Sequence, residues 1–332
     1  MQTAISKLPL NSMAERLLKH VVGMEDIGKG SLLEIMAESP EMELVANSGG
    51  SNQLAGKLFY LEFRTASKLT RETMISAIVK LGGHPEGPEL PERSLWSEML
   101  EDRVRSIANY GYNASVLRLP NIGDAKKVAD VSRIPVINGG EFGNGYDNFG
   151  EHPLQAIADL QTIHEVFPYF RDLNIVVAGY GFVTSHPAVN SILVATSWFK
   201  GVNLTIASAA VTVDEPKNAI ETWLKEHGIT IPRIRTNEEL KRALRDADVL
   251  YLPQLLDPKT EANIRRHNKN GFQIDDEVLS YLPSRAIILH GMRQAERPPT
   301  ALHKQASWDR QEQNNLSTKM VLLTRIDYKR AA

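Results

Sequence analysis

Two polar side chains stand three residues apart where a helix is expected to begin. His152 and Gln155 lie in the segment EHPLQAIADLQTIHE, directly after the glycine-rich stretch NGGEFGNGYDNFGE. Residues three apart in a helix share one side, and the first N–H groups of a helix have no partner within it. A flexible glycine loop just before a helix is also a common place for binding groups. An exposed N-terminal helical turn explains the same spacing.

A second polar turn lies in the stretch FRTASKLTRETM, between an apolar run and a helical pattern. Ser67 could cap this helix, and Lys68, Thr70 and Arg71 would then lie beside its free N–H groups. Such a turn is typical of a phosphate site. Leu69 interrupts the pattern, and a capped helix with exposed Lys68 and Arg71 is the alternative interpretation.

Apolar runs of strand length alternate with helical patterns along the chain. Most runs are continuous in Val, Ile and Leu, which is typical of parallel strands covered on both faces. We expect strands at 57–63, 113–119, 134–138, 173–179, 202–208, 248–252 and 285–290. We expect helices at 68–81, 97–108, 122–132, 153–166, 188–199, 216–226, 236–245 and 307–325. This order predicts an α/β fold of two doubly wound parallel-sheet domains, with functional groups at the carboxyl ends of the strands.

Two local patterns refine this expectation. Thr236 and Glu239 have the spacing of a capping box, so a helix should begin there. The Pro-rich segment 84–96 is expected to be a loop.

The composition limits the possible functions. The 332 residues include 38 Lys or Arg and 40 Asp or Glu, giving a net charge of −2. This balance does not support a nucleic-acid or membrane partner, so any anion site must be local. The absence of cysteine excludes thiolate metal sites and a cysteine nucleophile. There is neither a long apolar run nor a signal-peptide pattern, so we expect a cytoplasmic protein.

The glycine turn GYGFVT is similar to those of dinucleotide-binding sites. It lacks a third well-spaced glycine and an acidic residue at the end of the next strand, so we expect neither NAD nor another cofactor, and no metal.

The part of the chain around His152 resembles the aspartate/ornithine transcarbamoylase family. It reads IPVINGGEFGNGYDNFGEHPLQAIADLQTIHE, similar to the family's apolar strand, Asn-Gly loop, His-Pro-x-Gln and Asp-Leu-x-Thr-Ile. NASVLRLP is similar to the preceding strand, which ends in a carbamoyl-phosphate-binding Arg, here Arg118. GKLFYLEFRTASKLTRETMISAIVKLGG fits the family's phosphate-binding stretch without a gap. DADVLYL, ILHGM and QEQNNLSTKMVLL follow in the expected order.

The resemblance implies a carbamoyltransferase acting on small molecules. A first domain, 1–150, completed by the C-terminal helix 307–325, would bind carbamoyl phosphate or a related anion. A second domain, 151–306, would bind the amine acceptor. The amine attacks the carbamoyl carbon while the protein polarises the carbonyl oxygen and neutralises the phosphate. A homotrimer is also implied, with residues 90–99 near a neighbour's site, although the family's loop lysine is absent there.

The resemblance also assigns site residues. The groups around the carbamoyl oxygen and amide match Thr70, Arg118, His152 and Gln155. In the phosphate turn, Ser67 and Arg71 match, while Lys68 and Leu69 replace the second residue and the central Arg. Lys68 could supply a point charge but not the bidentate fork of Arg. A gapped alignment places Ala66 at the central position, so the Arg is missing either way.

The acceptor half departs furthest from the family. Ser185 or Pro187 occupies the place of an acceptor-binding Arg, and Gln254 replaces another cation. Met292 and Arg293 follow the last strand and are the candidate acceptor-binding residues. These changes predict an acceptor other than aspartate. The alternative is a weak or inactive member that acts as a ligand-binding or partner subunit.

Overall fold

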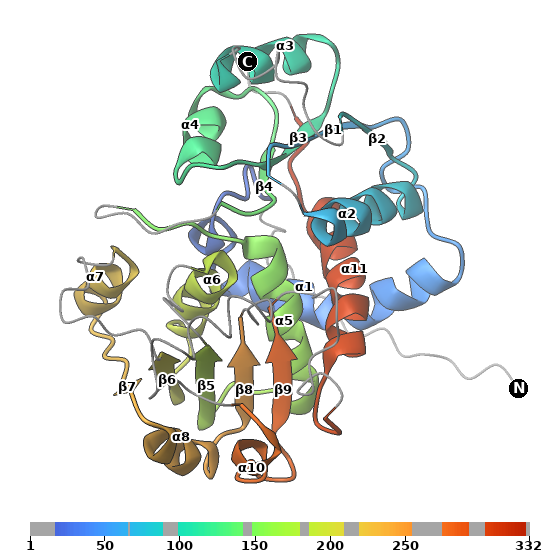
Figure 1. Cartoon of the computed structure of the whole chain (residues 1–332). Helices are drawn as coiled ribbons and strands as arrows, with labels where there is room; N and C mark the ends of the chain where they lie inside the picture. Colours follow the sequence, from blue (N-terminus) through green and yellow to red (C-terminus); the bar gives the residue numbers. More distant parts are fainter. Residues whose placement is uncertain are drawn as a thin grey trace, which may run out of the picture.

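Two parallel sheets organise the chain in this computed structural model (Figure 1). The structure describes residues 17–65, 67–88, 99–141, 148–179, 186–208, 219–253, 274–291 and 303–329. The first sheet has the order β2-β1-β3-β4 and contains β1 (Leu58–Phe63), β2 (His84–Glu86), β3 (Ala114–Arg118) and β4 (Val136–Asn138). The second has the order β7-β6-β5-β8-β9 and contains β5 (Leu173–Gly179), β6 (Val202–Ser208), β7 (Arg233–Ile234), β8 (Val249–Leu252) and β9 (Ile287–His290).

These sheets confirm the predicted α/β class with two doubly wound parallel sheets. Each predicted strand is present, with ends shifted by at most two residues. The sequence missed the two short edge strands, β2 and β7, which lack an apolar run. The prediction of a loop over 84–96 was therefore wrong for its first three residues, since β2 accommodates Pro85 at the sheet edge, where one unpaired backbone nitrogen is tolerated.

The helices in the described ranges flank these sheets. They are α1 (Met24–Asn47), α2 (Lys68–Lys80), α3 (Leu100–Asn109), α4 (Asp124–Val131), α5 (Pro153–Val166), α6 (Pro187–Thr196), α7 (Ala219–Glu226), α8 (Asn237–Leu244), α10 (Asp276–Leu279) and α11 (Trp308–Thr324). The sequence missed α10, a single turn, and α1, whose pattern is interrupted by Pro40 and by a kink at Gly28. The predicted capping box of α8 is confirmed, since Thr236 and Glu239 bond each other's backbone N–H.

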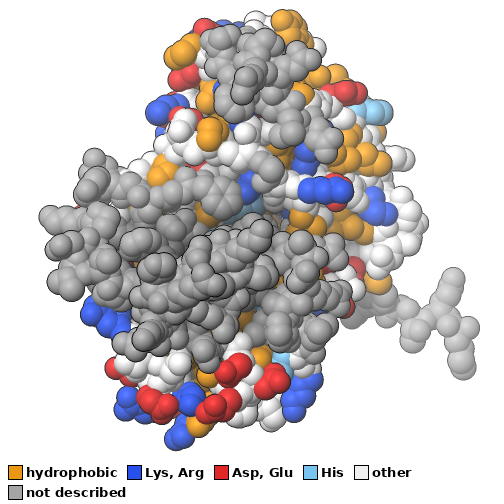
Figure 2. All heavy atoms as spheres, in the orientation of Figure 1, with side chains coloured by type: hydrophobic (Ala, Val, Ile, Leu, Met, Phe, Trp, Pro, Cys, Tyr) orange, Lys and Arg blue, Asp and Glu red, His pale blue; other side chains and the backbone are white. Residues whose placement is uncertain are grey.

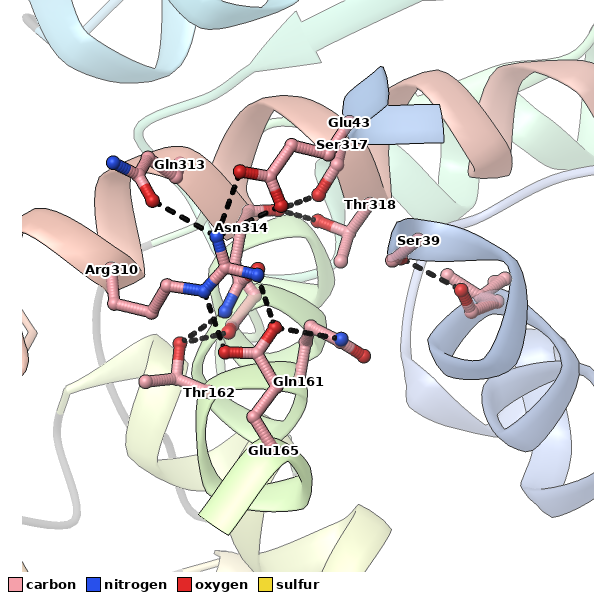
Figure 3. A network of polar contacts seen from close by, with 12 residues as sticks. Ser39, Glu43, Gln161, Thr162, Glu165, Arg310, Gln313, Asn314, Ser317 and Thr318 are labelled. Atoms are coloured by element: carbon pink, nitrogen blue, oxygen red, sulfur yellow. Dashed lines mark hydrogen bonds and ion pairs between the residues drawn. The ribbon is translucent and has the colours of Figure 1, made fainter. Parts of the chain in front are cut away.

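The C-terminal helix α11 lies beside α1, α5 and α2 and also contacts β9 (Figure 1). Arg310 at its start donates to Glu43 of α1 at 2.8 and 2.9 Å and to Glu165 of α5 at 2.5 and 2.6 Å (Figure 3). The helix α11 therefore contacts β9 of the second sheet directly and packs against α2, which in turn contacts β1 of the first sheet. The domain limits 1–150 and 151–306, with 307–325 completing the first domain, stay a prediction.

Positively and negatively charged side chains are mixed on the described surface. Figure 2 shows basic and acidic side chains interspersed at the end of the molecule where α8 and α10 lie. Lys241 of α8, for example, pairs with Glu238 at 3.3 Å and with Glu277 of α10 at 2.8 Å. Within the described ranges, no helix has both the length and the apolar character required to span a membrane.

The strand directions determine where the site lies. In Figure 1 the arrowheads of β5, β8 and β9 point toward the first sheet, so their carboxyl ends face the region of α2 and the start of α5. The carboxyl ends of β1 and β3 lie side by side, with Phe63 opposite Arg118. Parallel sheets place binding groups at such ends.

Candidate active site

The turn that opens α2 brings two of the predicted residues together. Ser67 occupies the N-cap position, as predicted, but its hydroxyl makes no bond to the helix backbone. It donates instead to Thr70 Oγ1 at 2.9 Å, and Thr70 is only 5% exposed. The turn therefore orients the Thr70 hydroxyl while its backbone N–H groups stay free of side-chain caps.

The two cations of this turn point elsewhere. Lys68 extends into solvent, with 81% of its side chain exposed, and lies 3.7 Å from Glu72 one turn later. Arg71 Nη2 donates to the backbone oxygen of Gly87 at 3.0 Å, and its buried Nε has no partner among the described residues. The structure thus does not bring Lys68 to the other predicted residues, because position 68 lies on the solvent side of α2.

His152 is held at the N-cap of α5 from the neighbouring helix α6. Its backbone N–H donates to Ser191 Oγ at 3.0 Å and to the Pro187 oxygen at 3.2 Å. Ser191 in turn donates to Glu151 Oε2 at 2.8 Å, and that carboxylate also accepts from the N–H of Met24 at 3.1 Å. Burial raises the pKa of Glu151 to about 7. These contacts fix the backbone of His152 at the start of α5.

The His152 ring contacts Thr70. Its Nε2 lies 3.3 Å from Thr70 Oγ1, and its Nδ1 accepts from the backbone N–H of Gln155 at 3.4 Å. Burial lowers the pKa of His152 well below its usual value, and the positive charges of Arg118 and Lys319 lower it further. The ring is therefore neutral at pH 7. Since Nδ1 accepts, the hydrogen-bond network assigns the single ring proton to Nε2.

Arg118 ends β3 beside this histidine. It is 3% exposed, and its Nη1 donates to the backbone oxygen of Gly139 at 2.6 Å. Burial lowers its pKa to about 10, so it remains a cation at neutral pH. A Cβ built on Gly140 would lie 2.3 Å from Arg118 Nη1 and 2.9 Å from His152 Cδ2. Gly140 thus lets the guanidinium and the imidazole pack against one backbone position.

Gln155 is fixed by partners from two helices. Its Nε2 donates to Asp159 Oδ1 at 2.9 Å, and its Oε1 accepts from Asn315 Nδ2 of α11 at 3.4 Å. Asp159 is fully buried and also accepts from Tyr251 at 2.8 Å and from Gln311 at 2.7 Å. Burial raises the pKa of Asp159 to about 6. The carboxyl group therefore anchors the Gln155 amide.

A small cavity of about 20 Å³ opens beside Gln155. It is lined by Leu69, Gln155, His290, Gly291, Trp308, Gln311, Glu312 and Asn315. Leu69 therefore places an apolar side chain on the α2 side of this cavity. The cavity lies where α2, α5, α11 and the end of β9 meet, and Gln155 is the predicted catalytic residue that lines it.

The structure thus gathers Thr70, His152 and Arg118, with Gln155 linked to them through the His152 ring. Sequence reasoning missed Gly140, Asp159 and the α11 residues. The Asn-Gly-Gly run after β4 could have indicated Gly140, whose φ of 115° favours glycine. The identity of Asn315 as a partner had no sequence signal.

Several predicted residues lie outside the described ranges. They are Met292, Arg293, Ser185, Gln254 and most of the loop 90–99. Among the residues that the structure does describe, none form a His, Cys, Asp or Glu cluster able to hold a metal ion.

Comparison with known proteins identifies the family. Residues 19–165 match the family described as "Aspartate/ornithine carbamoyltransferase, carbamoyl-P binding domain", and residues 175–326 match "Aspartate/ornithine carbamoyltransferase, Asp/Orn binding domain". The chain belongs to the aspartate/ornithine carbamoyltransferase family. The resemblance seen in the sequence is therefore confirmed.

Similar members of this carbamoyltransferase family are named as aspartate enzymes. The aspartate carbamoyltransferase catalytic subunit of Methanococcus vannielii is 32% identical to this chain, and the match covers 72% of this chain and 74% of the relative. That of Methanospirillum hungatei is 25% identical over 93% of this chain and 99% of its own. The catalytic subunit of M. jannaschii aspartate transcarbamoylase is 27% identical, with a TM-score of 0.75 over 93% of this chain and 97% of its own.

The fold is also that of a more distant carbamoyltransferase. Aspartate transcarbamoylase from Trypanosoma cruzi, solved with carbamoyl phosphate and aspartate, has a TM-score of 0.77 at 19% identity, over 95% of this chain and 97% of its own. At this identity the similarity supports the two-sheet fold.

Proposed function

We propose that this carbamoyltransferase-family protein transfers a carbamoyl group from carbamoyl phosphate to an amine acceptor other than aspartate. The observation that supports this proposal is the neutral imidazole of His152. Its Nε2–H is directed at Thr70, beside the buried cation Arg118. These donors suit a carbonyl oxygen that gains negative charge. No cofactor is needed for this reaction.

In the proposed reaction, the acceptor nitrogen attacks the carbamoyl carbon and the bond from carbon to the phosphate oxygen breaks. The proton lost by the nitrogen goes to the departing phosphate. Thr70, His152 and Arg118 stabilise the charge that develops on the carbonyl oxygen, and the N–H groups at the start of α2 face the phosphate. Gln155 positions the carbamoyl amide. The roles of Ser67, Lys68 and Arg71 in binding the anion stay predictions.

The acceptor is the finer part of the proposal. The relatives are named for aspartate, which argues against another acceptor. The residues argue for one, because the resemblance places the acceptor-binding Arg at Ser185 or at Pro187, the first residue of α6, and neither side chain offers a charge to a carboxylate. A dicarboxylate in a desolvated cleft requires fixed cations.

A panel of amines with radiolabelled carbamoyl phosphate tests the proposal. We expect a carbamoylated product with at least one amine acceptor, no measurable carbamoyl-aspartate, and loss of product in His152→Asn. Carbamoyl-aspartate formed at about 10 per second, an ordinary enzyme rate, would refute the acceptor part. Carbamoyl phosphate that neither binds in calorimetry nor reacts with any amine would refute the whole.

Leu69 favours a second candidate function. The resemblance expects the central Arg of the phosphate turn at this position, and the leucine instead lines the cavity beside Gln155. Without that Arg the protein would be a weak or inactive family member that binds a ligand or a partner chain. Phosphate binding without turnover of any amine would support this candidate. The implied homotrimer stays a prediction and is tested by light scattering.

A further inference from the structure

A chain of buried side chains runs from α11 to the predicted carbamoyl site. Lys319 and Asn315 lie one turn apart on α11, and both are 2% exposed. Lys319 Nζ donates to Asn315 Oδ1, Asn315 Nδ2 donates to Gln155 Oε1 at 3.4 Å, and Gln155 Nε2 donates to Asp159 Oδ1 at 2.9 Å. The chain therefore begins at the amino group of Lys319 and ends at the carboxylate of Asp159.

The two ends determine the direction of every bond between them. A carboxylate can only accept hydrogen bonds, and the Lys319 amino group donates to Asn315 Oδ1 whether it is protonated or neutral. Asn315 must therefore turn its oxygen to Lys319 and its NH₂ group to Gln155. Gln155 must turn its oxygen to Asn315 and its NH₂ group to Asp159.

The second contact of Lys319 supports this direction. Its Nζ also donates to Thr73 Oγ1 of α2 at 2.7 Å, and the Thr73 hydroxyl donates to the backbone oxygen of Leu69 at 2.8 Å. Thr73 can thus only accept from Lys319. The Lys319 amine is close enough to the site to lower the pKa of His152.

We propose that Asn315 and Lys319 are positioning residues that hold the Gln155 amide with its oxygen as the acceptor for the N–H of a carbamoyl ligand. The Gln155 oxygen has two lone pairs, and Asn315 occupies one. The second accepts from the ligand nitrogen. If the amide were free to turn over, its NH₂ group would meet the ligand NH₂ group and the hydrogen bond would be lost.

This positioning rests on the proposed function where it concerns the ligand, and it predicts a selectivity. Acetyl phosphate carries a methyl group in place of the NH₂ group of carbamoyl phosphate. The wild-type protein should bind carbamoyl phosphate about tenfold more tightly than acetyl phosphate, the effect of about one hydrogen bond. Inorganic phosphate has no carbamoyl group to meet the Gln155 side chain, so it should bind equally to wild type and to the positioning variants.

The variants are matched along one helix. Asn315→Asp keeps the size of the side chain but removes its donor to Gln155, and Lys319→Met removes the ammonium group. Asn314→Asp is the control, because Asn314 is fully buried one residue away and donates to Thr162 at 3.0 Å on another side of α11 (Figure 3). A general loss of packing would affect Asn314→Asp as well.

Two measurements at pH 7 separate the inference from the proposed function. The first needs no ligand: in protein labelled with ¹⁵N-glutamine, the Gln155 side-chain signals, assigned by their loss in Gln155→Met, report how fast its NH₂ group exchanges with water. We expect exchange at least tenfold faster in Asn315→Asp and Lys319→Met, with Asn314→Asp like wild type. The second is calorimetry with carbamoyl phosphate, acetyl phosphate and inorganic phosphate.

Unchanged Gln155 signals in both Asn315→Asp and Lys319→Met overturn the inference, and either variant alone suffices if the other does not fold. Loss of the carbamoyl preference in these variants, with inorganic phosphate binding retained, supports it. Changed signals without any carbamoyl phosphate binding by wild type leave the positioning intact and overturn the proposed function instead.

Discussion

Replacing Gly140 with alanine should damage the site and the fold together. The added methyl group would lie 2.3 Å from Arg118 Nη1 and 2.9 Å from His152 Cδ2, so at least one of these side chains must move. The backbone φ of 115° is also unfavourable for alanine. Both effects act at one position, where the guanidinium and the imidazole meet.

The magnitude can be separated into two parts. Strain at the positive φ costs about 1–3 kcal/mol. Displacing Arg118 from the Gly139 oxygen, a hydrogen bond of 2.6 Å to a charged group, costs about 1.5–3 kcal/mol more. We therefore expect Gly140→Ala to lower the free energy of unfolding by about 2.5–6 kcal/mol.

Gly49→Ala isolates the strain. Gly49 has a φ of 107°, and its Cβ would meet no atom within 4 Å. Urea unfolding of both variants and calorimetry with inorganic phosphate make the comparison. Only Gly140→Ala should weaken phosphate binding. Equal unfolding free energies and equal phosphate affinities in the two variants would show that Arg118 and His152 do not pack against Gly140.

Three further predictions concern separate parts of the molecule. Leu69→Arg should tighten phosphate binding by about 1–3 kcal/mol if the turn is a weakened phosphate site, and unchanged affinity in calorimetry would argue against that origin. Burial lowers the pKa of Lys319 to about 7 in the folded state, against about 10.4 unfolded, so its contribution to stability is present above pH 10 and lost as the pH falls to 7. In urea unfolding, the free energy of unfolding of Lys319→Met should therefore rise relative to that of wild type by about 5 kcal/mol between pH 10 and pH 7. The same pH dependence in both proteins would contradict the burial argument. Thr236→Ala should cost about 1 kcal/mol of stability through the lost helix cap and leave phosphate affinity unchanged.

Strong local patterns predicted most of the fold. The long apolar runs predicted β1, β3, β5, β6, β8 and β9, because a strand buried on both faces needs apolar residues throughout. The helix α1 could not be predicted, since its glycines and Pro40 oppose helix formation and its contacts with α11 and α5 hold it in place. Edge strands β2 and β7 carry too few residues for any periodic signal.

The sequence likewise predicted some residues of the candidate site but not the directions of their side chains. The spacing of His152 and Gln155 at a helix start drew attention to them, and the family resemblance assigned both of them and Arg118 to the site. The sequence also suggested Lys68 as an anion-binding residue, but helix geometry turns it to solvent next to Glu72. Spacing along the chain gives a residue's helix but not the direction in which the assembled fold points it.

The sequence by itself determined the α/β class, the parallel strands and the carbamoyltransferase family, and it predicted Leu69 at the place of the family's central Arg. Tertiary structure alone decided that Asn315 and Lys319, more than 150 positions after Gln155, complete its surroundings, and that His152 is neutral. Hydrogen-bond direction and pKa depend on burial and on charges from distant segments, and both arise only when α11 packs against α5 and α2.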